Sequence, residues 1–263
     1  MRDSGGAEFW SKVAEAREGT HANVFEPVWK ATLDLLQVGQ GTRFLDAGCG
    51  TGMATEIAVK RGARAYGADA AENMIKLAKK RVAEAEFHHC DMESMPFEAG
   101  FFDTVMAINS IHFTNQPLFA LRELVRTCAA GGHVAIVCLG PRESHNFEAP
   151  VKAMLSLVPE SRKSEALFVD PFRLSAVGVL EMMFQEAGLV EVKHRFVECP
   201  VIYDSLAKAC ESMRNIALYP ATQTVAPQDA LDAAVTASLE PYVVADGRVV
   251  WKANHRIVMG KKP

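Results

Sequence analysis

The sequence predicts an α/β protein built on a doubly wound, mostly parallel sheet with helices on both faces and helical cap insertions. Short apolar runs alternate with amphipathic helical segments along its 263 residues, which is the pattern of βαβ units. A glycine-rich turn, GCGTG, follows the first of these runs. With 49% apolar and 23% charged residues, the composition is that of a folded globular chain, so disordered and collagen-like proteins are excluded.

Seven apolar runs bounded by glycine or polar turns are predicted as strands. They lie at residues 42–47, 64–68, 86–90, 103–109, 133–139, 190–197 and 249–259. Because right-handed crossovers are the default for such units, the first five strands and their helices are expected to form the doubly wound core. The remaining two strands are expected to extend the same sheet.

Three helices are predicted between these early strands. Residues 53–61 form the first, and Gly62 ends it with a left-handed conformation. Residues 71–83 carry apolar side chains at helical spacing. Residues 117–127 begin with a proline, which suits a first helical turn.

The later part of the chain is predicted to be more helical. Residues 175–187 form a helix that Ser175 caps and Gly188 ends. Residues 205–240 are mainly helical with proline interruptions, and residues 140–170 form a loop with short helices. These last two stretches are the expected insertions over the sheet.

The glycine-rich turn carries the strongest functional signal. Within FLDAGCGTG, residues 44–52, the glycines Gly48, Gly50 and Gly52 allow the backbone to approach a ligand closely. The following helix offers free N–H groups at its start. A dinucleotide fingerprint needs a third glycine where Met53 stands, which disfavours an NAD-dependent oxidoreductase.

Four consecutive strand ends carry polar side chains: Asp46, Asp69, Asp91 and Asn109. A carboxylate beside the turn, as at Asp46, repels phosphate and attracts a cation. Asp69 can accept hydrogen bonds from ribose hydroxyls, and Asp91 from an exocyclic amine. The alternatives are ordinary turn and cap roles for each residue. We expect an adenosine-containing ligand that bears positive charge.

The motifs LDAGCGTG, GADAAENM, CDMESMPFEAGFFD and the Gly131–Gly132 turn occur in this order between about residues 35 and 139. In this stretch the chain resembles the class I S-adenosylmethionine-dependent methyltransferases of the small-molecule type. It is similar to the ubiquinone/menaquinone C-methyltransferase-like group (methyltransferase type 11). The resemblance implies a Rossmann-like seven-stranded fold, S-adenosyl-L-methionine as cofactor, and methyl transfer to a small-molecule acceptor whose O, N, S or C nucleophile stays open.

The resemblance also implies how the methionyl and ribose parts of the cofactor are held. The three glycines of the turn would contact both parts. Asp46 would lie near the methionyl ammonium, directly or through water, and the backbone carbonyl of Asn109 would face the same group. Asp69 would hold the ribose diol.

For the adenine, the resemblance implies that Asp91 binds the exocyclic amine and that the Met92 backbone lies beside the ring. Met74 would pack against the adenine. Members of this family often cover the cofactor with an N-terminal segment, which here is some part of residues 9–25.

Two histidines are candidates for the base of the reaction. His112 follows the fourth strand and His145 follows the fifth, so both could face the transferred methyl group and accept a proton near neutral pH. The alternative is that they only shape the pocket. Cys49 has no base at recognisable spacing and is not expected to be a nucleophile. The six cysteines show no CxxC spacing, so no metal site is predicted.

We expect a single domain over residues 1–263, with the cofactor-binding core at about 35–139 and substrate-cap insertions at about 140–172 and 204–241. No nucleic-acid partner is expected, since the net charge is −4 and the DNA amino-methyltransferase motif is absent after the fourth strand. No membrane span is expected, a cytoplasmic location is predicted, and a homodimer is left open. A methyltransferase-like protein without methyl transfer is the main alternative function.

Overall fold

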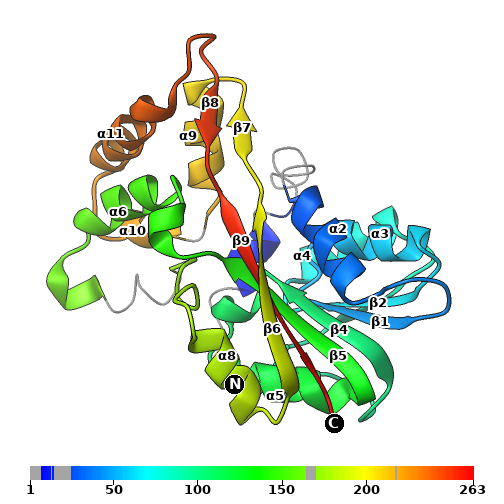
Figure 1. Ribbon diagram of the computed structural model, residues 1–263. Coiled ribbons are helices and arrows are strands. Elements are labelled where there is room, and N and C mark those ends of the chain that lie inside the picture. The colour runs from blue at the N-terminus through cyan, green and yellow to red at the C-terminus, as the bar shows by residue number, and fades with distance from the viewer. Residues whose placement is uncertain (1–6, 13, 15–24, 164–169, 217) are drawn as a thin grey trace.

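A seven-stranded sheet in the order β3-β2-β1-β4-β5-β9-β6 forms the centre of the molecule in the computed structural model (Figure 1). The structure describes residues 7–12, 14, 25–163, 170–216 and 218–263. The strands are β1 (Arg43–Ala47), β2 (Arg64–Asp69), β3 (Glu86–His89), β4 (Phe102–Ile108), β5 (Cys128–Leu139), β6 (Val190–Glu198) and β9 (Asn254–Lys261). The predicted doubly wound, mostly parallel sheet is confirmed.

The first five strands are parallel, and β9 runs antiparallel to both of its neighbours, β5 and β6. The carboxyl ends of the parallel strands therefore meet at one edge of the sheet. Because β9 runs the other way, that edge also receives the beginning of β9. This reversal brings a residue from near the end of the chain to the strand ends that carry the sequence motifs.

Helices cover both faces of this sheet. On one face lie α2 (Glu26–Leu35), α3 (Met53–Lys60) and α4 (Glu72–Arg81), and on the other lie α5 (Pro117–Thr127) and α8 (Val179–Glu186) (Figure 1). Alternation along each strand sends side chains to the two faces. Phe44 and Ile257 join the apolar cluster beneath α2 and α3, whereas Leu45 and Val258 join the cluster beneath α5 and α8.

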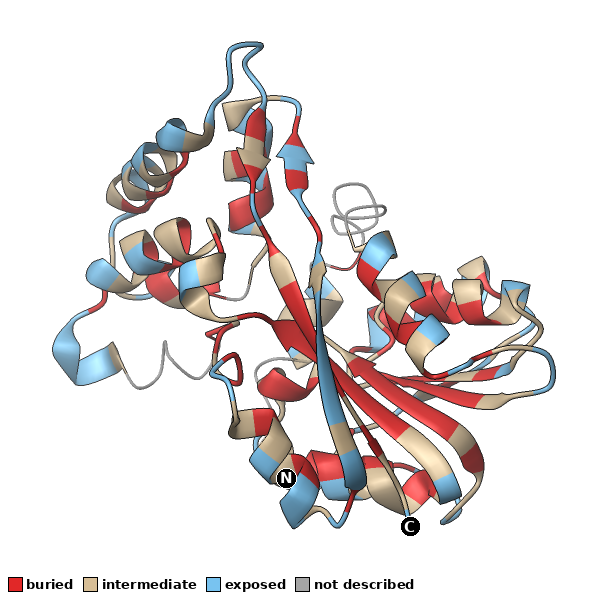
Figure 2. Cartoon of the chain, in the orientation of Figure 1, coloured by how far each residue is buried: buried red, intermediate tan, exposed pale blue. Residues whose placement is uncertain are grey.

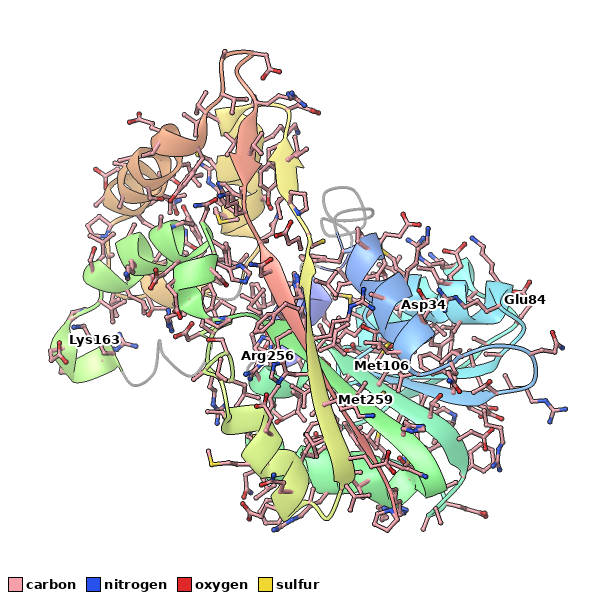
Figure 3. The ribbon with its side chains drawn as sticks, in the orientation of Figure 1. Asp34, Glu84, Met106, Lys163, Arg256 and Met259 are labelled. Atoms are coloured by element: carbon pink, nitrogen blue, oxygen red, sulfur yellow. The ribbon has the colours of Figure 1, made fainter. Side chains whose placement is uncertain are left out.

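The buried strands and the exposed outer helix faces are distinguished in Figure 2. The central strands β4 and β5 are mostly buried, while β6 at the sheet edge is mostly exposed. On β9 the alternation places Met259 and Arg256 on opposite sides of the sheet (Figure 3). The Arg256 side chain is fully buried, and its guanidinium contacts the carbonyls of Leu174 and Ala176 at 3.3 and 3.0 Å.

These contacts explain one error in the helix prediction. The helix expected at residues 175–187 begins only at Val179, and Ser175 does not cap it. Arg256 donates to the Ala176 carbonyl, which a helix capped by Ser175 would use internally, and the backbone N–H of Gly178 donates to the Glu181 carboxylate at 3.1 Å. Gly188 does end the helix region with a left-handed φ of 81°.

A long antiparallel ribbon connects the sheet to the cap. The predicted last strand, residues 249–259, is in fact two strands: β8 (Val249–Trp251) and β9. β8 pairs with a further strand, β7 (Val201–Tyr203), in a second sheet, whereas β9 pairs with β6. Between the two ladders the N–H of Cys199 donates to the Ala253 carbonyl at 2.8 Å. This hydrogen bond keeps the two segments side by side between the sheets.

The cap consists of the helices α6 (Glu148–Ser156), α9 (Leu206–Arg214), α10 (Leu218–Gln223) and α11 (Gln228–Leu239) around β7 and β8 (Figure 1). It has its own apolar core, which includes Met154, Met213, Leu231 and Trp251. Short 3-10 turns complete the described chain at Ile111–Phe113, Arg142–Ser144, Glu160–Arg162 and Glu240–Tyr242. Among the helices that the structure describes, none has the length and apolarity needed to span a bilayer.

Candidate functional site

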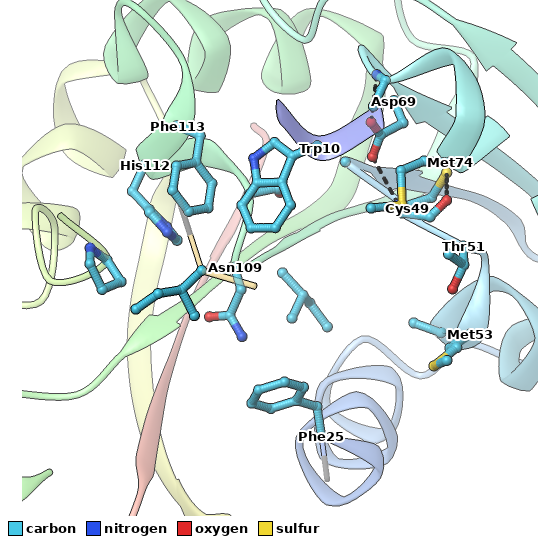
Figure 4. A pocket seen from close by; sticks show the side chains of 18 of the residues that line it. Trp10, Phe25, Cys49, Thr51, Met53, Asp69, Met74, Asn109, His112 and Phe113 are labelled. Atoms are coloured by element: carbon cyan, nitrogen blue, oxygen red, sulfur yellow. Dashed lines mark hydrogen bonds between the residues drawn. The ribbon is translucent and has the colours of Figure 1, made fainter. Parts of the chain in front are cut away.

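A cavity of about 330 Å³ lies between the carboxyl edge of the sheet and the cap. Figure 4 shows part of its wall, with Asp69, Cys49 and Met74 on one side and Asn109, His112 and Phe113 on the other. Most of the residues that the sequence nominated line this one cavity. They are Asp46, Gly48, Gly50, Asp69, Met74, Asp91, Met92, Asn109, His112 and His145.

Gly52 is the exception. It does not line the cavity, and it precedes α3 with a left-handed φ of 81°. A Cβ added there would lie 3.2 Å from the Cβ of Ala78 and 3.3 Å from the Phe87 ring. This glycine has a packing role, because it lets α3 approach α4 closely, and its contact with the cofactor stays a prediction.

Gly48 brings two strand ends together. A Cβ at Gly48 would lie only 2.3 Å from the Cβ of Ser110, and its φ of +73° also favours glycine. The Ser110 hydroxyl donates to the Ala47 carbonyl at 3.0 Å, which ties the loop after β4 to the end of β1. Gly50 differs, since nothing lies within 4 Å of an added Cβ and its face is open to the cavity.

Asp46 is a buried carboxylate with a poorly compensated charge. Its side chain is 2% exposed and accepts a hydrogen bond from the Thr55 hydroxyl at 2.7 Å. Burial raises the pKa of Asp46 to about 7, the hydrogen bond from Thr55 opposes that rise, and the charge of Asp69 adds to it. A cation bound beside Asp46 would stabilise its charged form.

Asp69 is fixed by the backbone on both sides. One carboxylate oxygen accepts from the N–H of Gly50 at 2.9 Å, and the other accepts from the N–H of Ala71 at 2.8 Å. A carboxylate oxygen can accept more than one hydrogen bond. Asp69 is thus held rigidly at the cavity wall and can accept from a diol.

Asp91, Met92 and Met74 form the neighbouring part of the wall. Asp91 is exposed, and its carboxylate accepts from the N–H of Glu93 at 2.9 Å, so its ordinary turn role is present as well. Met92 and Met74 are buried apolar side chains at the cavity, as a flat aromatic ligand requires.

Asn109 has an unusual backbone. Its φ of 48° lies in the left-handed region, and its N–H donates to the Val137 carbonyl at 2.9 Å. The buried amide oxygen of its side chain has no hydrogen-bond partner among the described residues. Strained backbone and an unsatisfied polar atom at a cavity are typical of functional sites.

His112 is buried and neutral. Its side chain is 2% exposed, and Nδ1 has no hydrogen-bond partner in the described structure. Burial, and to a smaller extent the positive charge of Arg173, lowers the pKa of His112 to about 3. The imidazole is therefore unprotonated and able to accept a proton, but it is a weak base in this environment.

His145 is held by the backbone at the start of β9. Nε2 contacts the carbonyl of Asn254, and the backbone N–H of Asn254 also donates to it at 3.3 Å. Nδ1 has no hydrogen-bond partner among the described residues. Burial lowers the pKa of His145, so this ring is also neutral.

Cys49 lies in the turn but is buried, and desolvation raises the pKa of its thiol well above the ordinary range. Since the thiolate is the nucleophilic form, this argues against covalent catalysis. Within the described ranges, no three or more His, Cys, Asp or Glu side chains are grouped so that they could hold a metal ion.

Some cavity residues were not found from the sequence, among them His255 of β9 and Trp251 of β8. Phe25 and Trp10, which also line the cavity, belong to the segment 9–25 that was expected to cover the cofactor. The Trp10 ring meets Phe113 edge-on at 5.1 Å, so the described part of segment 9–25 does reach the cavity, while residues 13 and 15–24 lie outside the described residues. The start of β9, where His255 stands, lies at the cavity only because β9 runs antiparallel to β5.

The fold and cavity define a Rossmann-like protein that binds a nucleoside-containing ligand at the carboxyl edge of its sheet. The sequence profile of a family described as "Methyltransferase domain" matches residues 45–136. A demethylmenaquinone methyltransferase of Staphylococcus aureus is 30% identical over 187 residues, which cover 64% of this chain and 76% of that protein. The chain belongs to the class I S-adenosylmethionine-dependent methyltransferases.

Solved structures with low sequence identity share the fold. The phosphoethanolamine N-methyltransferase 2 of Haemonchus contortus, in complex with phosphomonomethylethanolamine and S-adenosylhomocysteine, has a TM-score of 0.62 and 19% identity. That alignment covers 98% of this chain and 60% of the other. The [4+2]-cyclase SpnF has a TM-score of 0.54 and 18% identity over 90% of this chain and 80% of its own. The same fold thus serves more than one reaction.

Proposed function

We propose that this enzyme transfers the methyl group of S-adenosylmethionine to a small-molecule acceptor enclosed between the sheet and the cap. The observation that carries the proposal is one cavity with two unlike halves. Carboxylates at the ends of β1 and β2 and after β3 line the sheet half, while apolar and aromatic side chains of the cap line the other. A cationic nucleoside suits the first half, and an uncharged acceptor suits the second.

The residues of the sheet half fit this cofactor. The cationic cofactor would place a positive charge beside the buried Asp46 carboxylate. Asp69 offers fixed acceptors to the ribose hydroxyls. The amide oxygen of Asn109 is buried and unpaired, which suits a donor on the methionyl group. Open space above Gly50 leaves room for the ligand against the backbone. Asp91 is proposed for the adenine amine, with Met92 and Met74 beside the ring.

Bound there, S-adenosylmethionine supplies an electrophilic methyl group on a positively charged sulfur. The protein then has to hold the acceptor in line with that methyl group and exclude water. The cap supplies the enclosure, because its apolar core closes over the cavity. His112 is proposed as the group that receives a proton where the acceptor carries one, with His145 as the second candidate.

The proposal is tested by binding and by turnover. Calorimetric titration should show binding of S-adenosylhomocysteine and no comparable binding of NAD. Methyl transfer from labelled S-adenosylmethionine is then assayed over a panel of small acceptors. Demethylmenaquinone under reducing conditions comes first in that panel, since the Staphylococcus aureus relative is named for it. Binding of NAD without binding of S-adenosylhomocysteine would refute the proposal.

A second candidate function is cofactor binding without methyl transfer. The observation in its favour is the low basicity of His112, whose pKa burial lowers to about 3. A nucleophile that needs deprotonation would receive little help from this side chain. Binding of S-adenosylhomocysteine combined with no methylated product across the panel would favour this alternative.

We also propose that the chain forms one domain over residues 1–263, which a single cooperative unfolding transition would support. A cytoplasmic location is checked by cell fractionation, and homodimerisation by light scattering. A nucleic-acid acceptor is disfavoured because no Lys or Arg occurs among the described residues that line the cavity.

A further inference from the structure

His255 is the second residue of β9 and pairs with Leu139 at the carboxyl end of β5. The side chain is 0% exposed and lines the cavity. Its ring meets Phe25 edge-on at 5.3 Å, yet neither ring nitrogen has a hydrogen-bond partner among the described residues. Buried polar groups are nearly always paired, so two unpaired nitrogens on one buried ring at a cavity point to a ligand.

The ring of His255 is neutral, since burial, and to a smaller extent the charge of His145, lowers its pKa to about 3. A neutral imidazole presents one N–H donor and one lone-pair acceptor. The ring of His145 lies 6.3 Å away between centroids, and its Nδ1 also has no hydrogen-bond partner among the described residues. His255 therefore offers one donor and one acceptor to the cavity, and His145 adds a further unpaired ring nitrogen.

The surroundings restrict what such a ligand can be. Aliphatic and aromatic side chains line this half of the cavity together, and the aromatic ones include Phe147, Tyr203 and Trp251. The described lining contains neither Lys nor Arg, so a carboxylate or phosphate would meet no countercharge. The arginines nearby are already engaged: Arg142 pairs with Asp170, and Arg173 donates to the carbonyls of His112 and Thr114.

The described acidic residues of the cavity are Asp46, Asp69 and Asp91, all at the sheet edge. A cationic acceptor would therefore lack a carboxylate in the cap half. It would also leave the N–H of His255 unmatched, because an ammonium group cannot accept a hydrogen bond. A hydroxyl group donates and accepts at once, so it matches the neutral imidazole.

We propose that His255 is a specificity-determining residue that binds a hydroxyl group on an uncharged aromatic methyl acceptor. The inference deepens the proposed function and rests on it, since the acceptor half has meaning only beside a bound cofactor. His145 assists through its unpaired Nδ1, and the aromatic side chains of the cap enclose the ring of the methyl acceptor. The hydroxyl bound in this way need not be the atom that is methylated.

The test uses three bicyclic probes of similar shape, titrated by fluorescence into the full chain saturated with S-adenosylhomocysteine. They are 1-naphthol, 1-methylnaphthalene and 1-naphthoate. We expect 1-naphthol to bind about tenfold more tightly than 1-methylnaphthalene, the value of one well-made buried hydrogen bond. The anionic 1-naphthoate should bind most weakly, because it brings a charge without a partner.

Variants then show whether His255 causes the preference for 1-naphthol. His255→Phe should abolish the preference for 1-naphthol over 1-methylnaphthalene, and His255→Asn, which keeps a donor and an acceptor, should retain part of it. His194→Phe is the matched control, since His194 lies on the exposed edge strand β6 outside the cavity lining. Thermal melting verifies that each variant folds.

The outcomes are separable. S-adenosylhomocysteine binding is measured first, and its failure would refute the proposed function. With that binding intact, an unchanged preference in His255→Phe, or equal or absent binding of 1-naphthol and 1-methylnaphthalene to the natural chain, would overturn the role of His255. Loss of the preference in His194→Phe would overturn it as well.

Discussion

The Thr55 hydroxyl donates a hydrogen bond of 2.7 Å to the buried Asp46 carboxylate, linking the end of β1 to the first turns of α3. It opposes the effect of burial, which raises the pKa of Asp46 to about 7. A single hydroxyl therefore keeps this carboxylate close to ionisation at neutral pH. The start of a helix also favours negative charge. Asp46 is poised to ionise fully when a cation arrives beside it.

Binding of S-adenosylhomocysteine should tighten as the pH rises from about 5.5 to 7.5. Below the pKa of about 7, Asp46 is protonated, so binding the ligand ammonium must expel a proton. Affinity then improves up to about tenfold per pH unit on the acid side and levels off above the pKa. Calorimetry in buffers of different ionisation enthalpy would measure the proton released.

Two controls isolate Asp46 as the titrating group. Adenosine lacks the ammonium group, so its affinity should vary little over the same range. Thr55→Val removes the hydrogen bond that lowers the pKa of Asp46, and the profile should move to higher pH. If the affinity for S-adenosylhomocysteine showed the same pH dependence in Asp46→Asn as in the natural chain, this assignment would be contradicted.

Replacing Asp69 by Ala should abolish detectable cofactor binding. The two carboxylate oxygens are fixed by the N–H groups of Gly50 and Ala71, and each would accept from a ribose hydroxyl. Two lost hydrogen bonds to a charged acceptor amount to about 100-fold or more in affinity. Asp69→Asn keeps one acceptor and should bind weakly. Equal affinity of the natural chain for an analogue without ribose hydroxyls would count against this role.

The sheet edge could be predicted from the sequence because strand, turn and helix follow each other locally there. Asp46, Asp69 and Asn109 are positioned by the short elements that contain them, so their order along the chain predicts their meeting. Gly52 shows the limit of the same motif. Whether a glycine faces a ligand or a neighbouring helix depends on α4, which lies elsewhere in the sequence.

Gly48→Ala should destabilise the protein much more than Gly50→Ala. Both glycines have positive φ, but only Gly48 faces a clash, at 2.3 Å from the Ser110 Cβ. We expect on the order of 2–5 kcal/mol of lost unfolding free energy for Gly48→Ala. For Gly50→Ala we expect about 1–2 kcal/mol from backbone strain alone. Urea unfolding measures both values.

The variants Gly48→Ala and Gly50→Ala also distinguish an effect on stability from an effect on cofactor binding. Gly50→Ala should fold but bind S-adenosylhomocysteine poorly, because the added methyl group points into space that the ligand needs. In Gly48→Ala, a second change of Ser110 to Gly should recover part of the lost stability. Normal cofactor affinity in Gly50→Ala would place the ligand away from this turn.

The cap half of the cavity could not be predicted in the same way. His255 arrives there because β9 runs antiparallel, and no local pattern reveals the direction of a strand. The break between β8 and β9 was missed for a related reason, since the change of partner occurs through tertiary pairing. Trp251 and Tyr203 belong to the cap core as well as to the cavity, so no local pattern distinguishes them from ordinary core residues.

His112→Ala should leave cofactor affinity within about twofold and lower kcat if the acceptor must lose a proton, but by less than the about 10²–10⁴ typical of a general base whose pKa lies near the working pH. Because burial lowers the pKa of His112 to about 3, this residue stays unprotonated throughout the neutral range and should add no limb to the pH profile near 6.5. A fall in kcat/KM toward acid should instead follow Asp46 and disappear in Asp46→Asn. His145→Phe serves as the comparison, since its Nε2 is already engaged by the Asn254 carbonyl. A rise in KM with unchanged kcat in His112→Ala would make His112 a residue that only shapes the pocket.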